Sequence, residues 1–276
     1  MHDLIGLPAG SPISFMAALG MLRVLSCDRG LEARIGWRNG HAVIDGVTPN
    51  TAIEELTANM AERANSPEFN WADTPRNVRP SVYREACSQM TDDYRALGFM
   101  AGWATDAVVR DGFISVTRMD MTSGQQRLLR DLRDLAKKIT KPHFHTALLG
   151  GKYEYQTSFG LDPVAVRYHA YECKAPTKSS PPGQPGLIWL AFESIPLHPV
   201  IPITINRTQT IGWRYGGNVG YVWPIWDAML SIEEVQLLRA LPVDRLSSRP
   251  GVTEVWSSAY GKTGKYGMLQ PGKREY

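Results

Sequence analysis

Histidines and their neighbours are the residues best suited to acid–base or metal chemistry in this sequence. His143 and His145 are two residues apart, which places both side chains on one face of a strand but in different directions on a helix. No cluster of carboxylates or cysteines stands beside them to complete a metal site. Asp162, Arg167 and His169 include groups suited to general acid–base catalysis, but such a triple occurs in most sequences. The sequence therefore predicts no catalytic residue, no metal and no cofactor.

Motifs that identify common enzyme classes are absent as well. The sequence contains no Gly-x-Ser-x-Gly elbow, no His-Glu-x-x-His pair and no phosphate-binding loop of the Walker type. Residues 216–220 and 261–267 are rich in glycine, but their spacing favours hairpin turns over a phosphate cradle. We therefore expect a protein that is not an enzyme.

A second kind of chemistry, the binding of phosphate groups, is better represented. Residues 123–139 predict a helix in which leucines recur at helical spacing beside a basic edge. A row of basic side chains along a helix suits contacts with a nucleic-acid backbone. The basic edge comprises Arg127, Arg130, Arg133, Lys137 and Lys138. Ion pairs with carboxylates of the same helix are the alternative use of these charges.

Basic and aromatic residues also alternate over residues 201–276. Arg214 lies between Trp213 and Tyr215, and Lys262 and Lys265 flank the tip of a predicted hairpin. Basic side chains neutralise phosphates, and aromatic rings stack on exposed bases. We therefore include Arg214, Lys262 and Lys265 in the predicted nucleic-acid interface.

Three local signals predict where elements of the fold start or turn. Ser11 followed by Pro12 is typical of a helix start, because serine caps free amide groups and proline fits the first turn. The pair Asn39-Gly40 predicts a hairpin turn between two apolar segments. The spacing of Ser231 and Glu234 predicts a capping box at the start of another helix.

The remaining elements follow from hydrophobic periodicity and turn residues. We expect helices over residues 52–64, 81–90, 91–104, 123–139 and 141–150, strands over 112–119, 201–215 and 218–223, a long loop over 65–80, and a last hairpin over 252–269. Residues 187–192 are apolar on all sides and suit a buried helix or strand equally. This pattern predicts an α+β fold with mainly antiparallel strands and with hairpins near the N-terminal and C-terminal ends. We expect a single subunit over residues 1–276, with a possible division into a helix-rich part over 1–150 and a strand-rich part over 151–276.

Composition sets limits on the environment of the protein. The net charge of +3 is only mildly basic, so an interface with nucleic acid must depend on local patches. Cys27, Cys87 and Cys173 are widely separated, which indicates a reducing compartment. There is no leader-like start and no apolar run of about 18 residues. We therefore expect a cytoplasmic protein without a membrane partner.

Four segments, taken in order, resemble those of a known family. They are residues 10–25 (GSPISFMAALGMLRVL), 159–170 (FGLDPVAVRYHA), 190–199 (LAFESIPLHP) and 222–226 (VWPIW). Together they resemble accessory or large-subunit-like proteins of the type I-G (formerly I-U) CRISPR systems, which belong to class 1.

The resemblance implies a non-catalytic subunit of an RNA-guided surveillance complex in antiviral defence. Such a subunit contacts guide RNA, target DNA or the backbone subunits of the complex, which recruits a separate helicase-nuclease. No catalytic set is implied, and Asp162, Arg167, Phe192 and Glu193, which match the family segments, are expected to be structural. Guide pairing would read the sequence, and the protein would read shape or a short flanking motif.

Two alternatives from other classes remain open. The first is a metal-assisted nuclease or guide-RNA-processing enzyme that uses His143, His145 or His169. The second is an interaction adaptor in which Trp223, Trp226 and the proline-rich loop over residues 175–186 form a protein-binding face, because aromatic anchors concentrate at protein interfaces.

Overall fold

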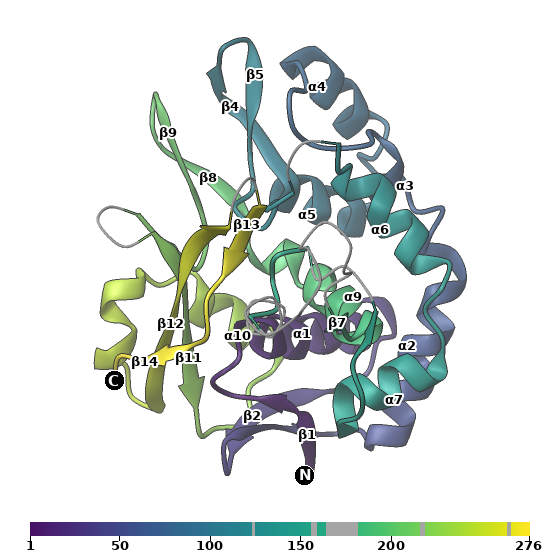
Figure 1. Cartoon of the computed structure of the whole chain (residues 1–276), viewed down its shortest axis with the longest axis vertical. Helices are drawn as coiled ribbons and strands as arrows, with labels where there is room; N and C mark the ends of the chain where they lie inside the picture. Colours follow the sequence, from purple (N-terminus) through teal and green to yellow (C-terminus); the bar gives the residue numbers. More distant parts are fainter. Residues whose placement is uncertain (123–124, 156–158, 164–181, 216–218, 264–265) are drawn as a thin grey trace.

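Two buried helices, α1 (Pro12–Arg23) and α9 (Pro185–Glu193), lie against each other at the centre of the fold (Figure 1). The computed structural model describes residues 1–122, 125–155, 159–163, 182–215, 219–263 and 266–276. Every residue of both helices is buried, so the apolar segment 187–192 forms a helix that is covered on all sides. Gly20 permits the close approach, because a Cβ atom there would overlap the carbonyl oxygen of Leu190.

A small antiparallel sheet forms the N-terminal end of the fold. Its strands are β1 (His2–Pro8), β3 (His41–Asp45) and β2 (Arg34–Arg38), in that spatial order. The predicted turn is confirmed, because Asn39 and Gly40 join β2 to β3 with φ angles of +52° and +77°. We did not predict β1, in which only Leu4 and Leu7 are buried.

A larger antiparallel sheet, formed near the C-terminus, packs against α1. Its order is β10 (Trp213–Arg214), β11 (Gly220–Trp226), β12 (Val252–Thr263) and β13 (Tyr266–Leu269), and β14 (Lys273–Arg274) also pairs with β12. All residues of β11 are buried. Their rings meet helix α1, where the Phe15 ring contacts those of Trp223 and Trp226. The predicted C-terminal hairpin is confirmed as β12 and β13.

Helices α2, α3, α6 and α7 lie on the right of Figure 1, on the side of α9 away from the large sheet, and α4 and α5 lie above α9 in this view. They are α2 (Pro49–Arg63), α3 (Pro67–Asn70), α4 (Pro80–Ser88), α5 (Tyr94–Trp103), α6 (Leu128–Ala136) and α7 (Lys141–Leu149). The predicted helix over 123–139 is therefore shorter than expected, because the flanking polar residues do not continue its buried face. The predicted loop over 65–80 contains α3, which begins at Pro67.

Two hairpins project from one end of the molecule, at the top of Figure 1. The first joins β4 (Ala104–Arg110) to β5 (Phe113–Val116), and the second joins β8 (Val200–Thr204) to β9 (Arg207–Thr210). Their tips are tied together, because Arg110 Nη2 donates a hydrogen bond of 2.7 Å to the backbone oxygen of Asn206. The single strand predicted over 201–215 is thus divided into β8, β9 and β10, with a reversal at residues 205–206.

The other elements are short. They are a π-helical turn at Val24–Asp28, the strand pair β6 (Glu154–Tyr155) and β7 (Pro182–Gly183), 3-10 turns at Ile195–Leu197 and Val243–Ser248, and helix α10 (Ile232–Arg239). The capping box of α10 is confirmed: the Glu234 amide donates to Ser231 Oγ, and the Ser231 amide donates to Glu234 Oε2.

The fold is α+β with antiparallel sheets, as the sequence predicts. Its main hydrophobic core includes residues from both sides of position 150, among them Phe99 and Phe192. Within the described ranges, each helix is too short or too polar to span a lipid bilayer.

Candidate nucleic-acid interface

Helix α6 presents the basic edge that the sequence predicts, but its central arginine serves the fold. The helix buries Leu128, Leu129, Leu132 and Leu135 against the body of the protein. Arg133 Nη1 donates hydrogen bonds of 2.6 and 3.0 Å to the backbone oxygens of Phe69 and Ala72, and Nη2 lies 2.7 Å from Asp73 Oδ1. These contacts anchor the chain after α3. The Arg133 side chain is only 17% exposed, so it has little surface to offer a ligand.

The other basic residues of this edge divide into paired and unpaired groups. Arg130 binds Asp131 Oδ1 at 3.1 Å, and Lys137 Nζ lies 3.2 Å from Asp134 Oδ1. Arg127 and Lys138 form no salt bridge with any carboxylate of the described residues. These two side chains are the basic groups of the edge that remain available for phosphates.

The C-terminal basic residues are divided in the same way. Arg214 forms two hydrogen bonds with the carboxylate of Glu275, at 2.8 and 2.9 Å, and its Nε lies 3.7 Å from Asp244. Lys262 is exposed on β12 and has no salt-bridge partner among the described residues. Lys265 lies outside the described residues.

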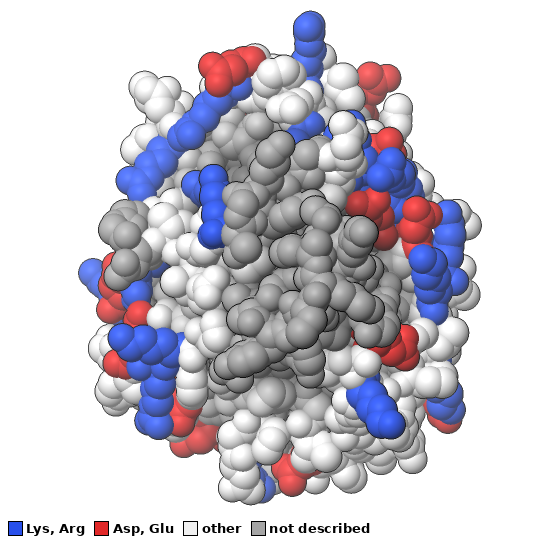
Figure 2. All heavy atoms as spheres, viewed as in Figure 1, with Lys and Arg blue, Asp and Glu red and all other residues white. Residues whose placement is uncertain are grey.

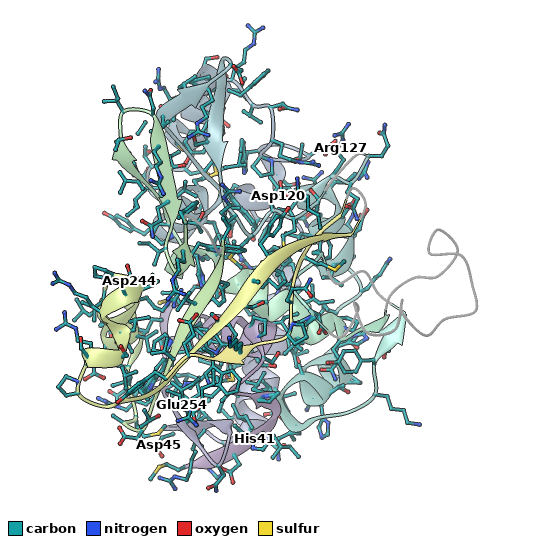
Figure 3. All side chains as sticks on the ribbon, turned by 60° about the vertical axis from the view of Figure 1, so that its left-hand side comes forward. His41, Asp45, Asp120, Arg127, Asp244 and Glu254 are labelled. Atoms are coloured by element: carbon teal, nitrogen blue, oxygen red, sulfur yellow. The ribbon has the colours of Figure 1, made fainter. Side chains whose placement is uncertain are left out.

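The structure does not gather all of these residues into one site. In Figure 3 Arg127 and Asp244, the partner of Arg214, lie on opposite sides of the molecule. Figure 2 shows basic side chains over α6 on the right and near the β8–β9 hairpin at the upper left, with acidic side chains among those on the right. The paired state of Arg214 and its position exclude it from an interface centred on α6.

A short connection links α6 to the hairpin that carries Lys262. The backbone oxygen of Gly160 accepts a 2.8 Å hydrogen bond from the amide of Leu269 on β13. A Cβ atom at Gly160 would overlap the oxygen of Gly267 and lie 3.0 Å from the Met121 side chain. The segment before α6 and the C-terminal hairpin are therefore packed on the two sides of Gly160.

Arg76, which the sequence did not single out, holds the chain that leads into α6. Its guanidinium group donates to the backbone oxygens of Thr122 and Gln126 at 3.0 and 2.7 Å, and it lies 3.4 Å from Asp120 Oδ2. Figure 3 shows Asp120 nearer the interior than Arg127. Burial raises the pKa of Asp120, and hydrogen bonds from Thr122 and the charge of Arg76 oppose this effect.

A basic and aromatic cluster at the upper end of the molecule includes residues that sequence reasoning missed. The guanidinium carbons of Arg118 and Arg207 lie 5.3 and 5.6 Å from the centre of the Tyr215 ring. The alternation of basic and aromatic residues pointed to Arg207 and Tyr215. Arg118 comes from another part of the chain, and only the tertiary structure brings it to the same ring.

Of the histidines proposed for an enzyme, the structure describes His143 and His145, which both lie on α7. His143 Nδ1 accepts a hydrogen bond of 3.0 Å from the amide of Thr140 and completes the capping box of α7. His145 lies two positions further on the same helix, so the two side chains point in different directions. His169 and Arg167 lie outside the described residues, and no group of three metal-ligating side chains occurs within the described ranges.

A polar pocket of about 290 Å³ lies beside the π-helical turn. Its walls include Cys27, Asp28, Glu62, Asp93 and Arg95. Burial raises the pKa of the Cys27 thiol, and this effect is larger than the opposing effect of Arg23. The thiol is therefore protonated near neutral pH and is a poor nucleophile.

A buried ion-pair network adjoins this pocket. Arg63 Nε lies 2.8 Å from Glu193 Oε1, and the same arginine binds Glu68. Arg23 also binds Glu193 and lies 2.8 Å from Asp28 Oδ1. All of these side chains are at most 6% exposed. The network joins α1, α2, α3 and α9, and it places the family-matching Glu193 in a structural role.

A second buried polar chain connects α9 to α10. His198 Nδ1 lies 2.9 Å from the Ser194 backbone oxygen, which only accepts, so Nδ1 carries the proton. Nε2 then accepts from the Tyr221 hydroxyl at 2.8 Å, and the hydroxyl oxygen accepts from Arg239 Nη2 at 3.4 Å. Burial, with a smaller contribution from Arg239, lowers the pKa of His198 to about 3. This histidine is therefore neutral and structural.

The tryptophans proposed for an adaptor face belong to the core. Trp223 is fully buried, and its Nε1 donates to the Ala9 oxygen at 2.9 Å. Trp226 is 2% exposed and donates to the Ile35 oxygen at 3.1 Å. Neither ring is available to a partner, so they cannot form the expected docking face.

A comparison of the sequence with models of known protein families finds no match, and no curated protein matches it either.

Proposed function

We propose that the chain is a non-catalytic, nucleic-acid-associated subunit of an RNA-guided CRISPR surveillance complex. Its partners would be guide RNA or target DNA, the other subunits of the complex and the helicase-nuclease that the complex recruits. The resemblance of four segments to type I-G proteins is the starting point of this proposal.

The observation that carries the proposal is the meeting of three of these segments in the core. Residues 10–25 form α1, residues 190–199 include the end of α9, and residues 222–226 lie in β11. Arg23 binds Glu193, and the Phe15 ring lies 6.2 Å from the Trp223 ring. A fold shared with the family would require these segments to lie in one core. Their contact supports a shared structural core.

Basic side chains without a salt bridge in the described ranges supply a second line of support. Arg127, Lys138 and Lys262 are free of carboxylate partners among the described residues, and Arg118 and Arg207 share one aromatic ring. Such groups bind a nucleic-acid backbone through the release of counterions, without requiring sequence recognition. The described residues therefore offer groups suited to phosphate contacts.

Native co-purification from the host tests the proposal. The tagged chain is isolated at low ionic strength, and nucleic acid and proteins in the eluate are sized with and without ribonuclease. A discrete small RNA with repeat-derived ends and stoichiometric protein partners is the expected result. The proposal would be overturned if the chain were recovered as a monomer without RNA, and if every other protein in the eluate were present only at the level found with an untagged control.

A further inference from the structure

We propose that Arg118, Arg207 and Tyr215 form a binding site for single-stranded nucleic acid. This inference rests on the proposed function and specifies one place where the chain meets its ligand. The site uses no residue of the basic edge of α6, and it adds Arg118 to two residues of the basic and aromatic segment over 201–276.

The two guanidinium groups are held close together around one aromatic ring. Their carbons lie 5.3 and 5.6 Å from the Tyr215 ring centre, so both positive charges lie beside the same ring. Both arginines are exposed, and Tyr215 is half-buried. Two positive charges in one small region attract an anion, which lowers their mutual repulsion when it binds.

Several carboxylates in the surrounding elements are already bound to other arginines. Asp120 binds Arg76, and Asp106 binds Arg84. Glu275 and Asp244 both bind Arg214, the residue next to Tyr215. None of the described residues forms a salt bridge with Arg118 or Arg207. Within the described ranges, both positive charges therefore remain available to an anion.

The backbone around the cluster is well fixed. The amide of Arg118 donates to Thr210 Oγ1 at 3.0 Å, and the amide of Thr210 donates to the Tyr215 hydroxyl at 3.0 Å. Arg110 ties the tips of the two projecting hairpins through Asn206. The side chains of the site therefore extend from a framework that is formed before any ligand binds, which lowers the entropy lost on binding.

The chemistry of the cluster favours a single strand over a duplex. Guanidinium groups donate paired hydrogen bonds to phosphate oxygens, and their planar faces also stack on bases. Bases in a duplex are stacked on one another and do not offer those faces. In a single strand, phosphates and bases are available together to the same arginines.

Binding of short oligonucleotides by the purified full chain tests the inference. Fluorescence anisotropy is measured with a labelled single strand of about 12 nucleotides, as RNA and as DNA of the same sequence, and with the matching duplex. For the double variant Arg118→Gln/Arg207→Gln, we expect weaker binding and a salt slope smaller by about 1.4, the value for two phosphate contacts on a single strand.

Matched variants separate this effect from general loss of charge or folding. Arg34→Gln removes an exposed arginine that is already bound to Glu234, so the single-strand affinity should stay close to that of the wild type. Tyr215→Leu removes the aromatic ring and should weaken binding about tenfold. Circular dichroism identifies any variant that fails to fold.

The outcomes distinguish this site from the proposed function as a whole. Unchanged single-strand affinity in the double variant, preference for the duplex, or no binding by the wild-type chain would each overturn the inference. In all three cases the host co-purification still decides the proposed function independently. Loss of co-purifying protein without loss of oligonucleotide affinity would assign the cluster to a protein interface and also overturn the inference.

Discussion

The carboxylate of Glu193 binds the guanidinium group of Arg63 through two hydrogen bonds, of 2.8 and 3.0 Å, although 130 positions separate the two residues. Arg63 ends α2 and Glu193 ends α9, so this pair joins the helical side of the molecule to its centre. Both side chains are fully buried, and the chain thus places a compensated charge network in its core.

Removal of the central carboxylate should destabilise the protein strongly. Glu193→Gln leaves Arg63 and Arg23 with too few negative partners in a buried setting, and we expect the free energy of unfolding to fall by about 3–5 kcal/mol. Urea denaturation measures the change. Glu275→Gln, which removes a 32% exposed partner of Arg214, should lower it by less than about 1 kcal/mol. Equal effects of the two variants would contradict the structural role of Glu193.

The close approach of α1 and α9 requires a glycine. Gly20→Ala places a methyl group against the Leu190 backbone oxygen, and we expect a loss of about 3 kcal/mol because backbone must move. Gly98→Ala is the matched control within a helix. Its Cβ atom would lie 3.4 Å from Pro196, an ordinary contact, so the gain in helix propensity should stabilise by up to about 1 kcal/mol. Thermal unfolding of both variants checks the contrast in sign.

Acid should weaken the fold through His198. The unfolded chain binds a proton at this residue as the pH falls through about 6.5, whereas the folded chain does so only near a pKa of about 3. Between about pH 3 and pH 6.5, the unfolded state therefore binds more protons than the folded state does. Stability should fall by up to about 1.4 kcal/mol per pH unit as the pH decreases across this window.

The variant His198→Gln should show a flatter dependence of the unfolding free energy on pH between about 7 and 4. His145→Gln, at an exposed position of α7, should reproduce the wild-type profile. A wild-type slope in His198→Gln would assign the acid sensitivity to other groups.

The basic edge of α6 should divide into structural and binding residues. Arg133→Gln breaks hydrogen bonds to two backbone oxygens and to Asp73, and we expect a loss of about 1–3 kcal/mol of stability. Arg127→Gln combined with Lys138→Gln should leave stability within about 0.5 kcal/mol. The double variant should instead lower the salt dependence of oligonucleotide binding. Denaturation and anisotropy performed on the same preparations test the division. If the double variant kept the wild-type salt slope, α6 would have no part in the interface.

Local signals in the sequence were sufficient for many elements. Ser11 and Pro12 start α1, Asn39 and Gly40 turn the first hairpin, and the Ser231 capping box opens α10. Each depends on backbone conformations and hydrogen bonds within a few residues, so the neighbouring sequence is enough to specify it. The α+β class followed from the same elements.

Tertiary structure alone decided the identity of α9 and the availability of the charges. An apolar segment such as 187–192 suits a buried helix or strand, and burial against α1 selects the helix. Basic residues look alike in sequence whether they are paired or free. The Arg133 guanidinium group donates to a backbone oxygen at Phe69. Arg118 reaches the Tyr215 ring, which Arg207 also contacts, only because distant segments pack together. The sequence determines which basic side chains the chain carries. Long-range contacts determine which of them are paired within the fold and which remain available to bind a ligand.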